Sequence, residues 1–229
     1  MQDSVISVII PAYNEEKTIG SVIEETIKVM DALGMPYEII VVDDGSIDHT
    51  RESAGNYKVK VLSNERNRGK GYALRKGFKY AQGNIIITMD ADGSHNPREI
   101  PLLIKPLFNG ADIVAGSRFM GRRKDHTSKL HIFGNKIINM AIAVLARKLV
   151  TDSQTGLRAI KREVLQKISL ESNGFEIETE IIVKGLKKGF KLQEMPINCR
   201  RRESGRSKLR TLQDGAKIFK TIIKSAAIG

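Results

Sequence analysis

The sequence predicts an α/β fold in which a mostly parallel sheet is covered by helices on both faces. Five short apolar runs in the first half of the chain are rich in β-branched residues, which is typical of strands buried on both faces. Stretches with helical periodicity separate these runs, and this alternation favours a parallel sheet. Polar residues follow several of the runs, at the strand ends where such folds bind their ligands.

The apolar runs and the stretches between them give the expected order of elements. Strands are expected at residues 5–10, 38–42, 59–62, 85–89 and 112–115. Helices are expected between them at residues 17–33, 50–55, 70–81 and 97–108. The last helix has clear start signals, because Asn96 is a good N-cap, Pro97 suits the first helical position and Glu99 lies three residues after the cap.

The composition is that of a globular protein from a reducing compartment. The single cysteine, Cys199, excludes an internal disulfide. The N-terminus lacks the basic and apolar regions of a signal peptide. The longest apolar stretch, residues 137–146, has about half the length that a bilayer requires. We therefore expect a cytosolic protein.

The net charge of +12 is concentrated near the C-terminus. Residues 184–224 contain thirteen lysines and arginines but only three acidic residues. Such a segment predicts a polyanionic partner, which can be a nucleic acid, an anionic membrane or a phosphorylated substrate. The absence of tryptophan and the aromatic content of 5% argue against a platform that stacks single-stranded nucleic acid.

Three strand ends in the predicted sheet are polar, and two of them are acidic. The stretches PAYNEE (residues 11–16), VVDDGS (41–46) and MDADGS (89–94) would all lie at one edge. Asp90 and Asp92 are two residues apart and can point to the same place, where they would repel each other unless a cation lies between them. Oxygen ligands with room for phosphates favour Mg²⁺ or Mn²⁺ over Zn²⁺. Each acidic stretch taken alone is equally compatible with a solvated turn or a helix start.

The ordered series of motifs resembles family 2 glycosyltransferases of the inverting, nucleotide-sugar-dependent type. The series in the first half is SVIIPAYNEEKTI, VVDDGSIDHT, NRGKGYALRKGF and MDADGSHNPREI. In the second half GSRF, DSQTGLRAIKREVL, GFEIETEIIVKGLKKGF and RRRESGRSKL are similar to the polyprenyl-phosphate glycosyltransferases, which include the dolichol-phosphate mannose synthases. The resemblance implies a GT-A-like domain over residues 1–208, with a nucleotide-sugar and metal half (1–118) and an acceptor half (119–208).

The resemblance also implies roles for individual residues. Pro11, Ala12, Tyr13 and Glu15 would hold the base and ribose of the donor, and Asp44 would read the base. Asp90 and Asp92 would coordinate a divalent cation that carries the donor diphosphate and assists its departure. Phosphate oxygens of donor and acceptor would be surrounded by Arg118, Arg202 and Lys208. Lys70 either assists at the phosphates or is a plain surface residue.

The expected acceptor is a polyprenyl or dolichyl phosphate, whose oxygen is already anionic at neutral pH. The reaction then needs no strong general base, and the four histidines, His49, His95, His126 and His131, are interpreted as surface or structural residues. Glu178 either orients Arg202 or the acceptor, or is merely an acidic residue in the first turn of a helix. Asp152 and Arg158 either form a structural ion pair or have a functional role. Family members often carry glutamine where this chain has Ser94, which puts a third metal ligand in doubt.

Residues 209–229 are expected to form an amphipathic helix. Its apolar stripe comprises Leu209, Leu212, Ala216, Phe219 and Ile223, and its basic face comprises Arg210, Lys217, Lys220 and Lys224. The stripe would either pack on the sheet or lie on an anionic membrane. A lipid acceptor favours the membrane, and we expect a peripheral protein on the cytoplasmic membrane face.

GDP-mannose is the favoured donor, and UDP-glucose is the alternative, because the motifs do not separate the two. A family 2 enzyme with another acceptor is a further alternative. A nucleotidyltransferase would share the sheet and metal, but its first loop should be basic where PAYNEEKTIG is acidic. A basic nucleic-acid-binding protein would explain the charge and would leave the acidic strand ends without a role. No nucleic acid partner is expected.

Overall fold

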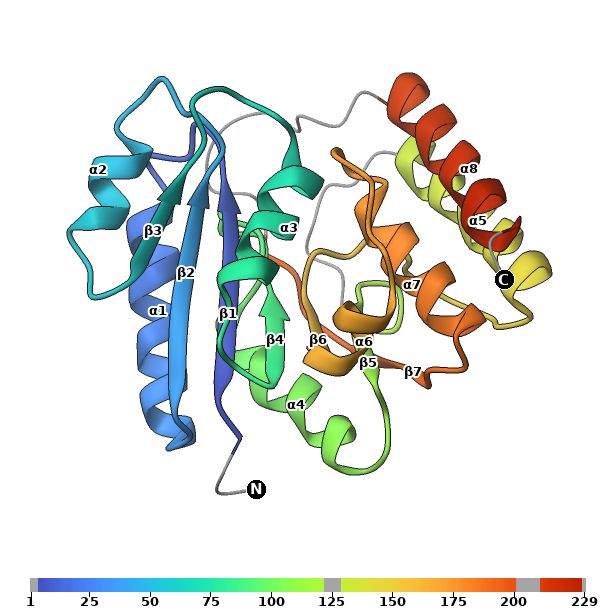
Figure 1. Ribbon diagram of the computed structural model, residues 1–229, viewed down its shortest axis with the longest axis horizontal. Coiled ribbons are helices and arrows are strands. Elements are labelled where there is room, and N and C mark those ends of the chain that lie inside the picture. Colours follow the sequence, from blue (N-terminus) through green and yellow to red (C-terminus); the bar gives the residue numbers. More distant parts are fainter. Residues whose placement is uncertain (1–3, 122–128, 201–210, 228–229) are drawn as a thin grey trace.

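The computed structural model describes residues 4–121, 129–200 and 211–227, which form one seven-stranded sheet with helices on both faces (Figure 1). The strand order is β3-β2-β1-β4-β6-β5-β7. All neighbouring strands are parallel except β6, which runs antiparallel to both β4 and β5. The strands are β1 Ile6–Ala12, β2 Tyr37–Asp43, β3 Lys60–Ser63, β4 Ile85–Thr88, β5 Ile113–Ser117, β6 Arg158–Lys161 and β7 Leu192–Pro196. The predicted mostly parallel sheet is confirmed.

Helices cover the sheet in two layers, and each layer buries its own apolar cluster. α1 and α4 pack on one face, where they contact the side chains of Ile6, Val8 and Ile10. α3, α5, α7 and α8 contribute to the cluster on the other face, which includes Ile9. The helices are α1 Ile19–Leu33, α2 Thr50–Gly55, α3 Lys70–Tyr80, α4 Ile100–Phe108, α5 Lys129–Ala146, α6 Arg162–Lys167, α7 Ile177–Lys187 and α8 Thr211–Ala227. Alternation along β1 therefore divides its side chains between the two layers.

The elements predicted for the first half are present with small shifts at their ends. The expected helix 97–108 is divided into a 3₁₀ turn, Pro97–Glu99, and α4. Asn96 is the cap, because its Oδ1 accepts a hydrogen bond from Arg98 N at 3.2 Å. The second half inserts β6 between β4 and β5, so both halves of the chain build one sheet. The expected boundary at residues 208 and 209 lies outside the described residues.

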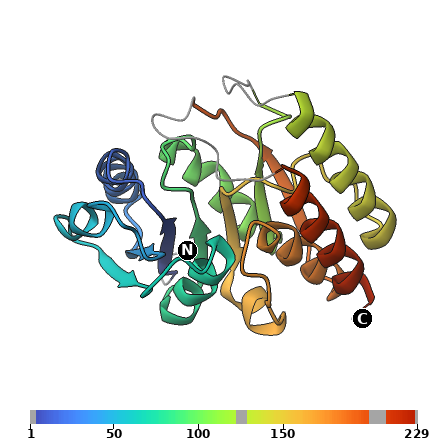
Figure 2. The same cartoon turned by 90° about the horizontal axis from the view of Figure 1, so that it is seen from above.

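α8 lies beside α5 and packs on α5 and α7 (Figure 2). It buries Ile218, Ile222 and Ser225, which lie on a different face from the expected stripe. Phe219 and Ile223 of that stripe are 47% and 52% exposed. Of the two alternatives for this stripe, packing on the sheet therefore does not hold for Phe219 and Ile223. Among the described residues, no helix combines the length and the apolarity needed to cross a membrane.

Candidate active site

The loops after β1, β2 and β4 meet at the carboxyl edge of these three neighbouring strands. The main-chain N–H of Glu15 donates to Thr50 Oγ1 at 2.7 Å, which ties the first loop to α2 behind the second. Thr18 Oγ1 donates to the carbonyl of Ala91 at 2.8 Å, which ties the first loop to the loop after β4. The three polar strand ends predicted from the sequence therefore form one continuous surface.

The residues expected to hold the nucleotide lie together on this surface. Pro11 and Ala12 end β1, and Tyr13 and Glu15 begin the loop that follows. Ala12 and Glu15 are buried, whereas Pro11 and Tyr13 are half-buried. The main-chain N–H of Asp44 donates to the carbonyl of Ala12 at 2.8 Å, so the ends of β1 and β2 stay in contact. The grouping agrees with the expected nucleotide site, and the individual roles stay predictions.

Asp44 is a buried carboxylate that is bound by neutral donors. Asn64 Nδ2 donates to its Oδ1 at 2.7 Å, and the main-chain N–H groups of Arg68 and Gly69 donate to its oxygens at 3.0 and 2.7 Å. Burial raises the pKa of Asp44 above its ordinary value, although these hydrogen bonds act in the opposite direction. Gly69 is required in this loop, because its φ is 99° and a Cβ there would lie 2.3 Å from the carbonyl oxygen of Asn173.

Asp90 is bound by cations instead. Lys70 Nζ lies 2.5 Å from Asp90 Oδ1 and 2.7 Å from Glu178 Oε1, so one ammonium group bridges two carboxylates. Arg158 is fully buried, and its Nε lies 3.2 Å from Glu178 Oε2. A Cβ at residue 156 would lie 2.5 Å from Asp90 Oδ2, so Gly156 leaves the space that this carboxylate fills. The sequence leaves open whether Lys70 is a surface residue, but its side chain is only 13% exposed.

Electrostatics stabilise the charged forms within this cluster. Burial opposes charge on both Lys70 and Asp90, but their mutual attraction overcomes it. The attraction of Asp90 and Glu178 keeps the pKa of Lys70 above its ordinary value. Lys70 and His95 together hold the pKa of Asp90 well below its ordinary range. Asp90 is thus a carboxylate throughout the neutral pH range.

His95 also belongs to this cluster, although the sequence was interpreted as giving it a surface or structural role. Its Nε2 lies 3.3 Å from Asp90 Oδ2, and its Nδ1 lies 3.9 Å from Cys199 Sγ. Burial disfavours the imidazolium, but the hydrogen bonds with Asp90 and Cys199 prevail and raise the pKa of His95 to about 10.

Asp92 is 7% exposed, and its Oδ1 accepts a hydrogen bond from the main-chain N–H of Ser94 at 2.9 Å.

Arg118 follows β5 at the same edge and is held by the fully buried Asp152. Its Nε and Nη2 donate to the two oxygens of Asp152 at 2.7 and 2.8 Å, and its main-chain N–H donates at 3.1 Å. The Arg118 side chain remains 25% exposed. Asp152 therefore pairs with Arg118, and Arg158 pairs with Glu178, whereas an ion pair between Asp152 and Arg158 was one of the two alternatives drawn from the sequence. Arg202 and Lys208, which were expected to bind phosphates, lie outside the described residues.

Asp90 and Asp92 have the chemistry to hold a divalent cation jointly with a phosphorylated ligand. Among the described residues, no group of three or more histidine, cysteine, aspartate or glutamate side chains can enclose a metal. Mg²⁺ is commonly bound by one or two carboxylates together with water and substrate phosphates, which fits this pair. Within the described contacts, Ser94 acts on Asp92 through its main chain.

Sequence reasoning missed Gly156 and the pairing of Arg158 with Glu178, and both residues belong to the segment that forms the antiparallel strand β6 or leads into it. β6 starts at the edge where the parallel strands end, so Gly156 and Arg158 reach the site from the opposite direction. The search for polar residues after apolar runs does not find residues that precede a strand. The long side chain of Arg158 could have indicated that this residue reaches the site from the start of β6. Its full burial does not follow from the sequence.

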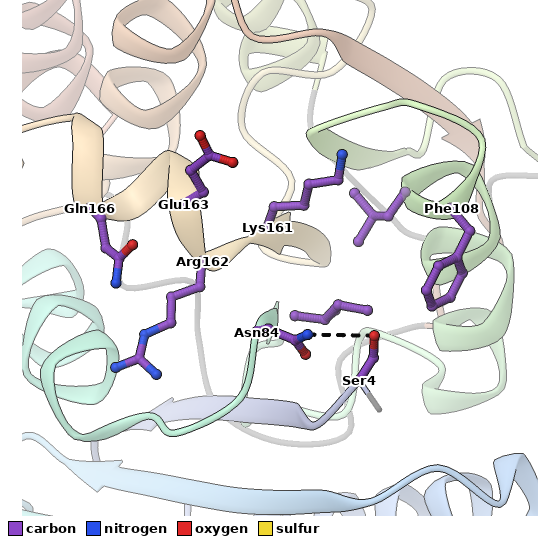
Figure 3. A pocket seen from close by; sticks show the side chains of 9 residues that line it. Ser4, Asn84, Phe108, Lys161, Arg162, Glu163 and Gln166 are labelled. Carbon is purple, nitrogen blue, oxygen red and sulfur yellow. Dashed lines mark hydrogen bonds between the residues drawn. The ribbon is translucent and has the colours of Figure 1, made fainter. Parts of the chain in front are cut away.

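Two of the cavities in the described part of the chain are lined by residues other than Asp44, Asp90 and Asp92. One, of about 390 Å³, is lined by Ser4, Asn84, Phe108 and Arg162, near the amino ends of β1 and β4 (Figure 3). Ligands of parallel sheets bind at the other edge, so this cavity is not a candidate for the active site. The second, of about 570 Å³, lies between the loop that contains Arg68 and the helix α8.

Comparisons with known proteins agree with this arrangement. Residues 7–169 match the family described as Glycosyl transferase family 2. The chain is 40% identical over 227 residues to an uncharacterized protein of Methanocaldococcus jannaschii, covering 96% of this chain and 91% of that one. It is 36% identical to a dolichol-phosphate mannosyltransferase of Pyrococcus furiosus, over 93% of this chain and 60% of that protein. It is 32% identical to the glycosyltransferase AglJ of Haloferax volcanii, over 96% and 72% of the two chains.

The fold also matches solved GT-A structures. Glucosyl-3-phosphoglycerate synthase from Mycobacterium tuberculosis, solved with Mn²⁺, uridine diphosphate and phosphoglyceric acid, superimposes with a TM-score of 0.80. The match covers 99% of this chain and 80% of the other at 24% sequence identity, which shows a shared fold and no more. The predicted GT-A-like architecture is confirmed.

Proposed function

Because the chain belongs to glycosyl transferase family 2, we propose that it is a hexosyltransferase that moves a sugar from a nucleotide sugar to a polyprenyl phosphate. The observation that carries this proposal is the sheet edge where Asp90 and Asp92 lie beside the Asp44 loop and Arg118. The names of two relatives support a lipid phosphate as the acceptor. They are the dolichol-phosphate mannosyltransferase and an undecaprenyl-phosphate 4-deoxy-4-formamido-L-arabinose transferase of Serratia proteamaculans. The chain spans 60% and 50% of the length of these relatives.

The proposed donor is GDP-mannose. Its support is the mannosyltransferase named among the relatives, at 36% identity. UDP-glucose is the alternative, because the M. tuberculosis synthase that shares the fold was also solved with UDP-glucose and Mn²⁺. In this proposal the base and ribose bind to Pro11, Ala12, Tyr13 and Glu15, and Asp44 reads the base.

The reaction is a single displacement with inversion. An oxygen of the acceptor phosphate attacks the anomeric carbon while the bond from that carbon to the donor's diphosphate oxygen breaks. A phosphate monoester is already anionic at neutral pH, so no proton has to be removed from the nucleophile. When bound, Mg²⁺ or Mn²⁺ at Asp90 and Asp92 stabilises the negative charge that develops on the leaving nucleoside diphosphate. The protein's own contribution is positioning and charge complementarity.

Arg118 is proposed to bind the acceptor phosphate. Asp152 orients its guanidinium through two parallel hydrogen bonds and is itself buried, so the geometry is fixed before a ligand arrives. Arg202 and Lys208 would complete the phosphate contacts, and Glu178 would act through the cations that it holds, Lys70 and Arg158. Replacing Arg118 by alanine should raise the KM for lipid phosphate about a hundredfold, whereas Arg162→Ala near the opposite edge should leave it unchanged.

A face formed by α5 and α8 is proposed to rest on the membrane that contains the acceptor. Met140 and Val144 of α5 are 68% and 72% exposed, and Phe219 and Ile223 of α8 lie on the neighbouring helix. Exposed basic residues flank this apolar face, including Lys136, Arg147, Lys148, Lys217 and Lys220. Apolar side chains with flanking cations suit an anionic bilayer surface.

Sedimentation with vesicles tests this face. Met140→Ser combined with Phe219→Ser should weaken binding to anionic vesicles, while Leu102→Ser, an equally apolar change on the opposite layer, should not. Equal binding by both variants contradicts the membrane contact and leaves the reaction itself untouched.

The function is tested by transfer assays with GDP-mannose and UDP-glucose in parallel, with Mn²⁺ and with or without a short polyprenyl phosphate. We expect glycolipid from GDP-mannose, abolished by chelation of the metal. Glycolipid formed from UDP-glucose and not from GDP-mannose would show that UDP-glucose is the donor. Metal-dependent nucleotide binding without any glycolipid would contradict the acceptor.

A further inference from the structure

Lys70 lies where a cation is not expected from local structure alone. It is the first residue of α3, and the positive end of the helix dipole disfavours an ammonium group there. Its side chain is nevertheless 13% exposed and points to Asp90 and Glu178, which are 29% and 2% exposed. The two carboxylates therefore determine where the Lys70 ammonium lies.

The glycines on each side of Lys70 bring the start of α3 against the chain at residues 172–174. A Cβ at Gly69 would lie 2.3 Å from the carbonyl oxygen of Asn173, and one at Gly71 would lie 2.5 Å from that of Ser172. The main-chain N–H of Tyr72 donates to the carbonyl of Asn173 at 3.1 Å. This close packing places Lys70 between the loop after β4 and the first turn of α7.

The ion-paired network of Lys70, Arg158, Asp90 and Glu178 has balanced charges without a metal, and His95, which lies 3.3 Å from Asp90, adds positive charge beside it. Lys70 and Arg158 carry two positive charges, and Asp90 and Glu178 carry two negative charges. A divalent cation that arrives alone at Asp90 would meet the Lys70 ammonium 2.5 Å from one of that carboxylate's oxygens. A divalent cation that arrives with the diphosphate of a nucleotide sugar, which carries two negative charges, would leave the net charge of the cluster unchanged, and the diphosphate would offer Lys70 a new anionic partner.

We propose that Lys70 is an internal counter-ion that holds the place of the divalent cation at Asp90, so that metal and nucleoside diphosphate bind to this protein together. The inference rests on the proposed function, because it takes the ligand to be a nucleoside diphosphate, free or as part of a nucleotide sugar. On joint binding the Lys70 ammonium leaves Asp90, keeps Glu178 as a partner and turns to the phosphate oxygens. The site is thereby protected from metal without donor.

The proposal and a purely structural role for Lys70 predict opposite changes in the affinity for Mn²⁺ alone when the lysine is replaced. Removing the ammonium leaves Asp90 and Glu178 without their shared cation, so Mn²⁺ alone should bind more tightly. With nucleotide present, the same change removes a phosphate contact and should weaken the joint binding. A lysine that only supports the fold would weaken Mn²⁺ binding in both conditions when it is removed.

The experiment is a titration of the full chain with Mn²⁺, followed by electron paramagnetic resonance of the free ion, with and without GDP or UDP. The variants are Lys70→Met, Lys70→Arg, which keeps the charge, and Lys79→Met, which removes an exposed lysine from the same helix. In the wild type, nucleotide should tighten Mn²⁺ binding at least about tenfold. Lys70→Met should bind Mn²⁺ alone about tenfold more tightly than the wild type, and Lys70→Arg and Lys79→Met should resemble the wild type.

Unchanged or weaker binding of Mn²⁺ alone by Lys70→Met would overturn the proposal. If that variant does not fold, equal Mn²⁺ affinity of the wild type with and without nucleotide would overturn it. Failure of the proposed function looks different, because neither GDP nor UDP would then bind while the effect of Lys70→Met on Mn²⁺ alone would remain. The double variant Lys70→Met, Glu178→Gln removes one positive and one negative charge, so it keeps the net charge of the wild type and should return the affinity for Mn²⁺ alone to that of the wild type.

Discussion

Asp44 and Asp90 follow two strands on either side of β1, and the protein holds these two carboxylates in opposite ways. Asp44 accepts hydrogen bonds from neutral donors, including two main-chain N–H groups of one loop. Asp90 is bound by the Lys70 ammonium and by His95. Neutral donors that belong to the backbone fix a loop, whereas a side-chain cation can be exchanged for another cation. The same residue type at the same sheet edge is therefore held by neutral donors in one region and by side-chain cations in the other.

The largest expected effect is on the side of Asp90. Asp90→Asn keeps the shape but removes the charge, so transfer should fall by about 10²–10³-fold as stabilisation of the leaving group is lost. Initial rates with saturating donor and acceptor measure it. Asp112→Asn, which alters an aspartate paired with Lys161 at 2.8 Å at the opposite edge, is the matched control and should keep its activity. Equal losses of transfer rate in Asp90→Asn and Asp112→Asn would contradict a special role of Asp90 in the reaction.

Arg158 should have the next largest effect, and on stability rather than on rate alone. Its guanidinium donates to the carbonyls of Thr155, Ser153 and Glu178 and pairs with the Glu178 carboxylate, all with no exposed surface. Arg158→Met should lower the free energy of unfolding by about 3 kcal/mol or more, because buried acceptors lose their partners. Urea denaturation measures this. Arg162→Met, four residues further on, should change stability by less than about 0.5 kcal/mol.

Asp44 should show the effect of a structural carboxylate. Asp44→Asn replaces an acceptor oxygen by an NH₂ group that faces N–H donors, and it should lower the free energy of unfolding by about 1–3 kcal/mol. The concentration of Mn²⁺ needed for half-maximal transfer should stay the same, because the hydrogen bonds described for Asp44 go to Asn64, Arg68 and Gly69 and not to Asp90 or Asp92. The exposed Asp31→Asn is the control for stability. A shift in the Mn²⁺ requirement of Asp44→Asn would contradict the division between the two carboxylates.

The smallest effect is a change in the pH dependence of stability. His95 has a pKa of about 10 in the folded protein and about 6.5 when unfolded, so the folded state holds the extra proton between these values. Its contribution to stability is complete below about pH 6.5 and is lost as the pH rises through about 10. In the metal-free protein, His95→Gln should therefore lose less stability than the wild type between pH 7 and 10. His49→Gln, an exposed histidine, should follow the wild type.

The first half of the fold could be predicted because its strands are parallel and, apart from the edge strand β3, largely buried on both faces. Continuous β-branched runs such as β1 and β2 are visible without any partner, and the helices between them have periodicity. β6 could not be predicted, because its four residues are flanked by no alternating pattern and its position between β4 and β5 is set by long-range pairing. The exposed stripe on α8 was visible, but which of its two apolar faces packs depends on α5 and α7.

The site divides in the same way. Asp44, Asp90 and Asp92 were predictable, because polar residues after parallel strands must gather at one edge. The environment of each was not, because Lys70, His95 and Arg158 reach Asp90 or Glu178 from three separate segments. Lys70 illustrates the limit, since a lysine between glycines before a helix has the same sequence appearance whether it is exposed or buried.

The most direct test of the central claim is a crystal structure of the protein with Mn²⁺ and a nucleoside diphosphate. We expect Mn²⁺ in contact with Asp90 and Asp92, the diphosphate bridging it, Lys70 Nζ turned from Asp90 to a phosphate oxygen, and the hydrogen bonds of Asp44 unchanged. A nucleotide bound elsewhere, or Mn²⁺ bound while the contact of Lys70 with Asp90 persists, would contradict it.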